Sequence, residues 1–150
     1  MAVIEVVGED VNTWVTAQAG SGGFRTAITT RSHTFDADEP LALGGTDAGP
    51  TPYEYLLGAL AGCTAMTLRI YADRKKWPLE SAEVRLRTAR SHEVDCEHCE
   101  TDPVGITRIE RQIELFGPLT DEQRDRLMQI ADRCPVKQTL ERGVRVVNAP

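Results

Sequence analysis

The chain has 150 residues, of which 41% are hydrophobic and 27% are charged, and its formal net charge is −6. This size and composition are typical of one soluble globular domain, so we expect a single domain over residues 1–150. The negative charge argues against nucleic acid or an anionic membrane as the main partner. The sequence begins without a basic segment followed by an apolar one, so we expect no signal peptide and a cytoplasmic location, where cysteines stay reduced.

The first part of the chain predicts a set of short strands. Apolar and polar residues alternate over residues 3–7, 12–19, 24–30 and 33–38, and glycine-containing turns follow the first two segments. Because strands joined by such short turns run in opposite directions, these should form an antiparallel sheet. The next segment, residues 38–52, is rich in glycine and proline and should be a loop.

A long helix is predicted over residues 53–75. Thr51 and Pro52 stand where an N-cap residue and a first-turn proline belong, and Pro78 follows the end of the helix. The longest uncharged run, residues 55–68, has 14 residues, whereas a membrane-spanning helix needs about 20. We therefore expect a buried helix of the core rather than a membrane span.

The same helix is apolar on nearly all sides, which predicts that it is buried all round. Gly58 and Gly62 lie four residues apart, on one face, where they let another backbone approach closely. A chain of this length has little material to cover such a helix, so we expect an intertwined homodimer in which the second copy covers it. The alternative is a chain whose sheet covers one side of the helix and whose loops cover the other.

The second half of the chain predicts two long strands, two helices and a final strand. The strands cover residues 79–93 and 104–116, a capped amphipathic helix covers 118–134, a short helix covers 135–143, and the last strand covers 144–148. The strands come in blocks with helices between the blocks. This order favours an α+β fold with antiparallel sheets over a parallel α/β fold.

Two cysteines are candidates for chemistry. Cys63 falls in the middle of the long helix, where no helix N-terminus lowers its pKa and burial raises it, so a nucleophilic Cys63 needs a nearby cation. The alternative is that Cys63 is a core residue. Cys134 precedes Pro135 at the start of the short helix, with Arg133 and Lys137 beside it, which favours the thiolate. A capping role and a redox role are both open for Cys134.

The segments around these cysteines resemble a known family. They read GPTPYEYLLGALAGCTAMTLRIYADRK and IADRCPVKQTLERGV, and both are similar to the OsmC/Ohr family of thiol-dependent hydroperoxide reductases. The segments DEPLALGGTDAGPTPYE and DCEHCE are similar to its OsmC-like branch. The resemblance covers nearly the whole chain. It implies an α+β fold with antiparallel sheets around a long buried central helix, in an intertwined, domain-swapped homodimer.

The resemblance also implies a two-cysteine peroxidase that needs no cofactor and protects against oxidative stress. Cys63 would be the peroxidatic cysteine, which attacks an organic hydroperoxide, or more weakly hydrogen peroxide, and becomes a sulfenic acid. Cys134 would be the resolving cysteine that forms a disulfide with it, and a dithiol reductant would restore both thiols. The rival interpretation is a dimer that binds a small apolar ligand or senses oxidants, without efficient catalysis.

The family places an arginine–glutamate pair beside the attacking cysteine. Glu54 is the candidate glutamate, but it precedes Cys63 by nine residues, about 13 Å of helical rise, so it would act from the partner chain or only add charge to the first helical turn. Arg25 and Arg31 are the candidate arginines. An apolar substrate pocket is expected from the apolar residues of the long helix, namely Leu56, Leu57, Leu60, Met66 and Tyr71.

The segment between the two long strands holds a second group of metal-binding and redox residue types. Cys96 and Cys99 form a CxxC pair with His92 and His98 close by. These four side chains match the ligand types of a zinc site. A redox pair, and a polar hairpin tip without an essential role, are the alternatives.

Overall fold

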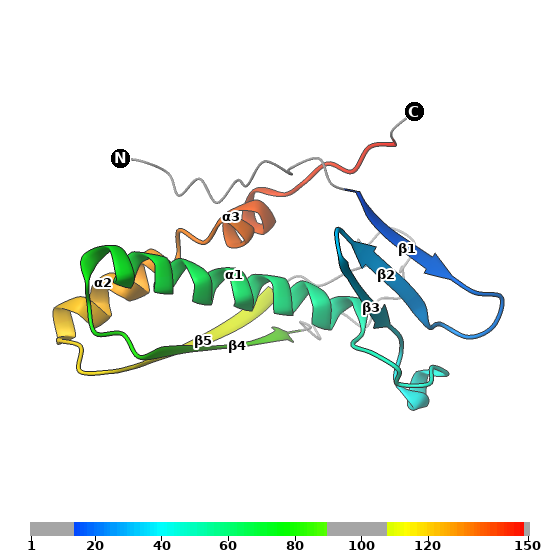
Figure 1. Cartoon of the computed structure of the whole chain (residues 1–150), viewed down its shortest axis with the longest axis horizontal. Coiled ribbons are helices and arrows are strands. Elements are labelled where there is room, and N and C mark those ends of the chain that lie inside the picture. Colours follow the sequence, from blue (N-terminus) through cyan, green and yellow to red (C-terminus); the bar gives the residue numbers. More distant parts are fainter. Residues whose placement is uncertain (1–13, 90–107, 149–150) are drawn as a thin grey trace, which may run out of the picture. The chain divides into compact units, whose positions relative to one another are not determined.

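The computed structural model describes residues 14–89 and 108–148 of the chain (Figure 1). These residues belong to two units, Met1–Tyr55 and Leu56–Pro150, and each unit is described by itself. The architecture is a mixed α/β fold with two antiparallel sheets and one long helix. The single domain expected from the chain length stays a prediction.

The N-terminal unit contains a three-stranded antiparallel sheet. Its strands are β1 (Val15–Ala19), β2 (Thr26–Thr30) and β3 (His33–Ala37), in the order β1-β2-β3. The strands predicted over the same part of the chain are therefore confirmed, with shorter bounds. The strand predicted over residues 3–7 lies outside the described residues.

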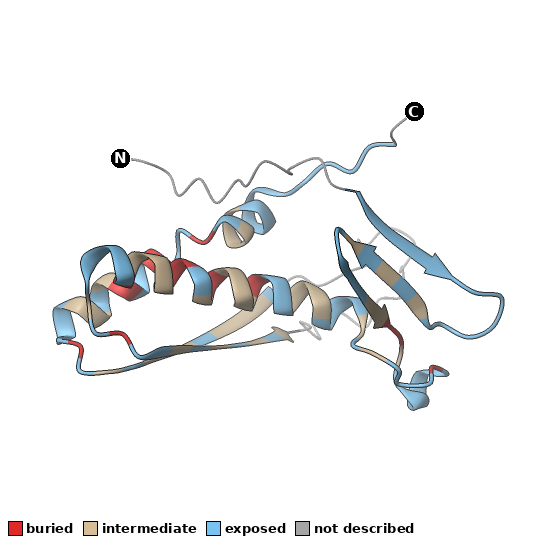
Figure 2. Cartoon of the chain, viewed as in Figure 1, coloured by how far each residue is buried: buried red, intermediate tan, exposed pale blue. Residues whose placement is uncertain are grey.

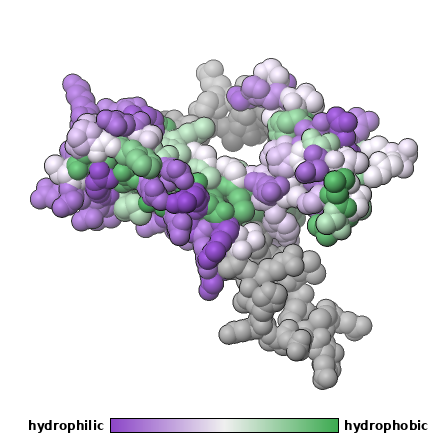
Figure 3. Space-filling model, turned by 90° about the horizontal axis from the view of Figure 1, so that it is seen from below, coloured by the Kyte–Doolittle hydropathy of each residue, from purple (hydrophilic) through white to green (hydrophobic). Residues whose placement is uncertain are grey.

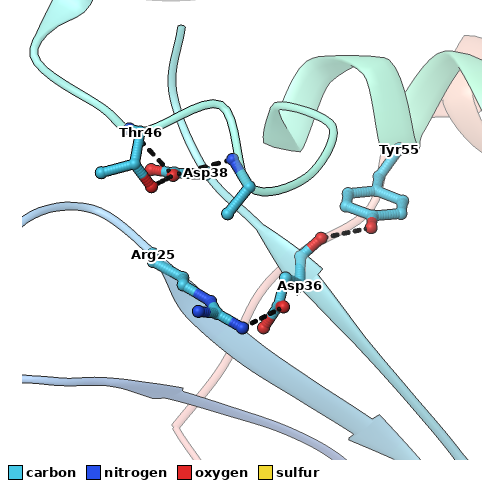
Figure 4. Close-up of polar contacts among 6 residues, drawn as sticks. Arg25, Asp36, Asp38, Thr46 and Tyr55 are labelled. Atoms are coloured by element: carbon cyan, nitrogen blue, oxygen red, sulfur yellow. Dashed lines mark hydrogen bonds and ion pairs between the residues drawn. The ribbon is translucent and has the colours of Figure 1, made fainter. Parts of the chain in front are cut away.

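A polar network organises the loop that follows β3. The Asp38 side chain is buried, and its carboxylate accepts hydrogen bonds from the backbone N–H groups of Glu39, Thr46 and Ala48 at 2.8, 3.0 and 3.1 Å. The Thr46 hydroxyl donates a fourth, at 2.6 Å (Figure 4). A short 3₁₀ helix, η1 (Leu41–Leu43), lies within this loop. Asp38 thus replaces the regular hydrogen bonds that this segment lacks.

Helix α1 (Pro52–Lys75) begins at the end of the N-terminal unit and continues into the C-terminal unit. The Thr51 hydroxyl accepts a hydrogen bond from the Glu54 N–H at 3.2 Å, and the Glu54 carboxylate accepts one from the Thr51 N–H at 2.7 Å. This reciprocal pair is a capping box, so the predicted helix start is confirmed.

The single chain buries α1 along one face only (Figure 2). Its buried residues are Leu60, Thr64, Thr67, Leu68 and Ala72. Burial all round, as the apolar sequence predicts, is therefore not supplied by one chain. In the described part of the chain, α1 is also the one helix long and apolar enough to span a membrane, with 28% of the relevant window buried. That is weak support for a span, because the core helix of a soluble protein meets the same criterion.

The C-terminal unit contains a two-stranded antiparallel sheet, formed by β4 (Ser81–Ala89) and β5 (Arg108–Phe116). The register sets Ala82 opposite Leu115 and Val84 opposite Ile113, so these apolar side chains share one face. The other face carries charged residues that pair across the strands, including Arg87 with Glu110 at 2.6 Å. The alternation predicted for both strands is confirmed.

Two further helices complete this unit, α2 (Asp121–Ala131) and α3 (Pro135–Arg142). Thr120 and Gln123 form a second capping box at the start of α2, as predicted. The core joins the C-terminal half of α1, the sheet and α2, and its buried residues are Leu68, Ala72, Leu79, Leu119, Leu127 and Ala131. Both cysteine-bearing segments adjoin this core.

The strand predicted over residues 144–148 is not present in the described chain. Val144, Val146 and Val147 are 68%, 91% and 70% exposed. A strand requires a neighbour that completes its ladder of hydrogen bonds, and no strand of the described residues pairs with this segment. The prediction of a strand over residues 144–148 is therefore wrong for the described chain.

Candidate functional site

Cys63 lies in the middle of α1 and is half-buried. Burial raises the pKa of its thiol and contact with Cys134 raises it further, while the Val136 N–H acts in the opposite direction. In the described part of the chain no cation is among the main influences on this pKa. Cys63 is therefore, within one chain, a weakly acidic thiol.

Cys134 is the N-cap residue of α3 and is completely buried. Burial acts to raise its pKa, but nearby donors outweigh burial and the pKa lies below its ordinary value. These donors are the backbone N–H groups of Lys137 and Val136, the hydroxyl of Thr64 and the thiol of Cys63. The first N–H groups of a helix have no partner within the helix, so they are free to stabilise a thiolate.

The structure brings these two thiols together, although they are far apart in the sequence. Cys63 and Cys134 lie close enough for each to shift the pKa of the other, and both are free cysteines. Their pKa values shift in opposite directions: burial and the neighbouring Cys134 raise the pKa of Cys63, whereas the donors around Cys134 lower its pKa although burial opposes them. Two thiols in contact can form a disulfide without large backbone movement. The roles of Cys63 as attacking and Cys134 as resolving cysteine stay predictions.

An open groove lies between α1, β5 and α3, with a volume of about 730 Å³. Its lining residues are Leu56, Leu60, Arg108, Ile109, Arg111, Lys137, Leu140 and Glu141. Leu60 precedes Cys63 by about one helical turn. Lys137 lines the groove, and its backbone N–H acts on the Cys134 sulfur. The groove is therefore lined by residues of both helices that bear a cysteine, α1 with Cys63 and α3 with Cys134 at its N-cap, although neither cysteine is among its lining residues.

Only some of the residues expected to form the substrate pocket line the groove. Leu56 and Leu60 line the groove, whereas Leu57, Met66 and Tyr71 are not among its lining residues. Met66 is 66% exposed, and Tyr71 packs against the apolar core of the C-terminal unit. Their part in binding a substrate stays a prediction.

The candidate arginines belong to the N-terminal unit, whereas Cys63 belongs to the C-terminal one. The Arg25 guanidinium forms an ion pair with Asp36 at 2.7 Å (Figure 4). Arg31 is exposed and lies in the turn between β2 and β3, in a left-handed backbone conformation with φ of 48°. A role for either arginine beside Cys63 stays a prediction.

Glu54 has a structural partner, because its carboxylate caps α1 through the Thr51 N–H. It lies on the same helix as Cys63, nine residues earlier, so helical rise alone separates their backbones by about 13 Å. Capping explains the position of Glu54, and a catalytic role from a partner chain stays a prediction.

The proposed zinc ligands Cys96, Cys99, His92 and His98 lie outside the described residues. Over residues 14–89 and 108–148 the structure contains no group of three or more side chains suited to hold a metal ion. The metal, redox and structural interpretations of this segment stay open.

Sequence reasoning missed Thr64 and the charged wall of the groove. Thr64 is completely buried, and its hydroxyl acts on the Cys134 sulfur. Arg111 lines the groove and pairs with Asp132 at 2.7 Å, and Lys137 pairs with Glu141 at 2.7 Å. The sequence around Thr64 does not indicate a functional role, because the side chain that Thr64 acts on, Cys134, comes from a distant segment of the chain.

One protein-family model matches most of the chain. Residues 45–147 match the family model described as OsmC-like protein. No curated protein sequence matches the chain at a significant level.

Several solved structures share the fold. An OsmC-like protein from Mycoplasma pneumoniae superposes with a TM-score of 0.70 at 21% identity, over 88% of this chain and 89% of that one. The organic hydroperoxide resistance protein OsmC from Legionella pneumophila has a TM-score of 0.59 at 19% identity, over 84% and 86% of the two chains. An organic hydroperoxide resistance protein from Elizabethkingia anophelis has a TM-score of 0.53 at 19% identity, over 84% and 85%. At these identities the similarity establishes the fold alone.

Proposed function

The chain belongs to the OsmC-like family, and from this premise we propose that it is a thiol-dependent peroxidase that reduces organic hydroperoxides and protects the cytoplasm against oxidative stress. Solved structures of the same fold include proteins named for organic hydroperoxide resistance. The observation that carries the proposal is the contact between Cys63 and the acidic thiol Cys134 in one chain.

In the proposed reaction the Cys63 thiolate attacks the outer oxygen of the hydroperoxide. The O–O bond breaks, the alcohol leaves, and Cys63 becomes a sulfenic acid. The Cys134 thiolate then attacks the Cys63 sulfur and hydroxide leaves as water, which forms the disulfide. A dithiol reductant restores both thiols and is itself oxidised to a disulfide. A lowered pKa suits Cys134 to the second step, because the thiolate is the attacking form.

The first step requires a cation, because burial raises the pKa of Cys63 within one chain. We assign this role to Arg25 or Arg31, from the same chain or from the partner of a homodimer, with Glu54 of the partner as the residue that orients the arginine. The test is the pH dependence of peroxide reduction in Arg25→Ala and Arg31→Ala. Loss of the thiolate-stabilising arginine should shift the rise in activity to higher pH, and an unchanged profile in both variants contradicts the assignment.

The groove between α1, β5 and α3 suits the substrate proposed here. Leu56, Leu60, Ile109 and Leu140 offer apolar surface for the organic part of a hydroperoxide. The cations Arg111 and Lys137 are each paired with an acidic side chain, which lowers their attraction for water and ions.

We propose that the working form is an intertwined homodimer. One chain leaves α1 buried on one face only and exposes many large apolar side chains, some of which are visible as green surface in Figure 3. The most exposed are Trp14, Val15, Leu41, Leu43, Met66, Val144, Val146 and Val147. Such exposure is typical of a surface that another copy covers. Light scattering at micromolar concentration should give twice the mass of the chain, and a monomer contradicts this part of the proposal.

Peroxide consumption with a dithiol reductant tests the function. Wild-type protein should consume cumene hydroperoxide, and Cys63→Ser should lose at least about a hundredfold in rate, because the attacking sulfur is gone. The double variant Cys96→Ser/Cys99→Ser is the matched control and should keep its activity. Equal, slow consumption by wild type and Cys63→Ser contradicts the peroxidase.

Mass spectrometry after a peroxide pulse tests the proposed disulfide. Wild-type protein should lose two hydrogens between Cys63 and Cys134, and Cys134→Ser should keep an oxygen adduct on Cys63. The same adduct on the wild-type protein, without a disulfide, contradicts the resolving role of Cys134.

The raised pKa of Cys63 favours a second candidate, a dimer that binds a small apolar ligand or senses oxidants without efficient turnover. A sensor would form the disulfide once per oxidant pulse but would not turn over when a dithiol is supplied. Multiple turnovers per chain distinguish the peroxidase from this candidate.

A further inference from the structure

The disulfide between Cys63 and Cys134 can be reduced from either end, and the structure distinguishes the two ends. We infer that the external reductant attacks Cys63 and expels Cys134 as the thiolate, and that Thr64 is the positioning residue that receives this thiolate. The inference rests on the disulfide of the proposed function and adds the direction of its reduction.

Access is the first argument. An attacking thiolate must approach one sulfur of the disulfide from outside, and the rate depends on access to that sulfur. Cys134 is 0% exposed, whereas Cys63 is only partly buried. A reductant therefore reaches the Cys63 sulfur first.

The leaving group is the second argument. In thiol–disulfide exchange the sulfur that forms the more stable thiolate leaves faster. Cys134 occupies the N-cap position of α3, an eight-residue helix, where the backbone N–H groups of Val136 and Lys137 act to lower the pKa of its thiol. Cys63 lies in the middle of a helix, where the N–H groups are used by the helix itself.

Thr64 is the third and independent argument. Its hydroxyl oxygen is completely buried and has no hydrogen-bond partner among the described residues. The hydroxyl of Thr67, one turn later, donates to the Cys63 carbonyl at 2.8 Å, the usual partner of a threonine in a helix. Thr64 does not make the equivalent bond, and its hydroxyl acts instead on the Cys134 sulfur.

An unpaired buried hydroxyl normally destabilises a protein. A neutral thiol is a weak acceptor, whereas a thiolate is a strong one, so Thr64 gains a full hydrogen bond only when Cys134 is ionised. The Thr64 hydroxyl therefore stabilises the Cys134 thiolate, which forms when the disulfide is cleaved, more than it stabilises the intact disulfide.

The step balances without any further reagent than the dithiol already proposed. The reductant thiolate attacks the Cys63 sulfur, a new S–S bond forms there, and the bond to Cys134 breaks with its electron pair on Cys134. The second thiol of the reductant then attacks the mixed disulfide, releases Cys63 and closes the oxidised reductant. Two electrons pass from the dithiol to the protein disulfide.

Mapping of the mixed disulfide tests the direction. The protein is oxidised with diamide, which forms the disulfide without a peroxide, then treated briefly with mercaptoethanol and quenched in acid. Peptide mass spectrometry should find the adduct on Cys63 in at least about tenfold excess over Cys134. An excess on Cys134, or equal amounts, overturns the inference, as does a diamide product that lacks the Cys63–Cys134 bridge. Failure of peroxide alone to form the bridge refutes the proposed function, not this inference.

Three threonine variants test the role of Thr64, with the pH dependence of Cys134 alkylation as the measurement. In a Cys63→Ala background, peptide-resolved reaction with iodoacetamide should shift to higher pH by about one unit in Thr64→Val. Thr64→Ser should keep the original profile, because it keeps the hydroxyl. Thr67→Val is the matched control and should leave the profile unchanged.

Two results overturn the role of Thr64. One is an unchanged profile in Thr64→Val, which would make the residue merely structural. The other is an equal shift in Thr67→Val, which would show a general effect of removing a buried hydroxyl from α1. With both cysteines present, Thr64→Val should also bring the adducts on Cys63 and Cys134 closer to equal amounts, and an unchanged ratio counts against the inference.

Discussion

The two units of the chain are held together by different forces. Among the described residues of the N-terminal unit, the buried side chains are those of Ala37 and Asp38, and the carboxylate of Asp38 makes four hydrogen bonds. The C-terminal unit contains a continuous apolar cluster that includes Leu68 and Leu127, both 0% exposed. One unit is ordered by a charge and its donors, the other by burial of apolar surface.

The two units also differ in the functional features that they carry. Both candidate cysteines, Cys63 and Cys134, belong to the unit with the apolar core. Among the described residues of the N-terminal unit, Ala37 is the one buried apolar side chain. Its exposed strand β1 (Val15–Ala19) and the exposed Trp14 are the surface that the proposed homodimer would cover.

The largest effect is expected from the apolar core. Leu127→Ala should lower the free energy of unfolding by about 2–5 kcal/mol, because it leaves a cavity among buried side chains. Met128→Ala is the matched control on the same helix, since Met128 is 41% exposed, and should change stability by at most about 0.5 kcal/mol. Urea unfolding gives both values, and equal losses would contradict a core centred on Leu127.

Asp38→Asn should affect the N-terminal unit instead. The substitution removes the charge and places an N–H donor where the carboxylate accepts, so the loop after β3 should lose its order. Hydrogen exchange at the Thr46 and Ala48 amides should accelerate about tenfold or more. Asp47→Asn is the control, with the same chemical change in the same loop. Equal acceleration in the C-terminal unit would contradict the separation of the two units.

The same carboxylate predicts a pH dependence. The pKa of Asp38 is lowered from 3.8 to about 2, chiefly by the Thr46 hydroxyl and also by three backbone N–H groups, although burial acts to raise it. The unfolded chain binds the proton at higher pH than the folded one, so the stabilisation is complete above about pH 4 and is lost as the pH falls through about 2. Amide chemical shifts of Thr46 and Ala48 should report this midpoint. A midpoint near 4 would refute the prediction, and Asp38→Asn should show no transition.

The smallest effect is expected at the junction of the two units, where Glu54 caps α1. Glu54→Ala should cost about 0.5–2 kcal/mol, and Glu54→Gln should cost much less, because glutamine also completes a capping box. Thermal unfolding measures both. If Glu54→Gln keeps its stability but loses peroxidase activity, Glu54 acts in catalysis beyond the cap. If both properties are kept, its role is capping alone.

Much of the fold was predictable from local sequence. Thr51, Pro52 and Glu54 mark the start of α1 within four residues, and Thr120 with Gln123 marks the start of α2. The alternation in β4 and β5 likewise follows from side chains two residues apart. These signals succeed because each depends on neighbours that are close in the chain.

Long-range contacts decided the rest. The chain sequence by itself determined which residues form helices, where these begin, and that Cys134 stands at the N-cap position of one of them. Only the tertiary structure decided that Cys63 lies near Cys134, that the Thr64 hydroxyl is buried without a hydrogen-bond partner among the described residues, and that residues 144–148 form no strand within the described chain. The physical reason is that a thiol pKa, a buried donor and a strand each depend on partners from distant segments, and no local pattern encodes those partners.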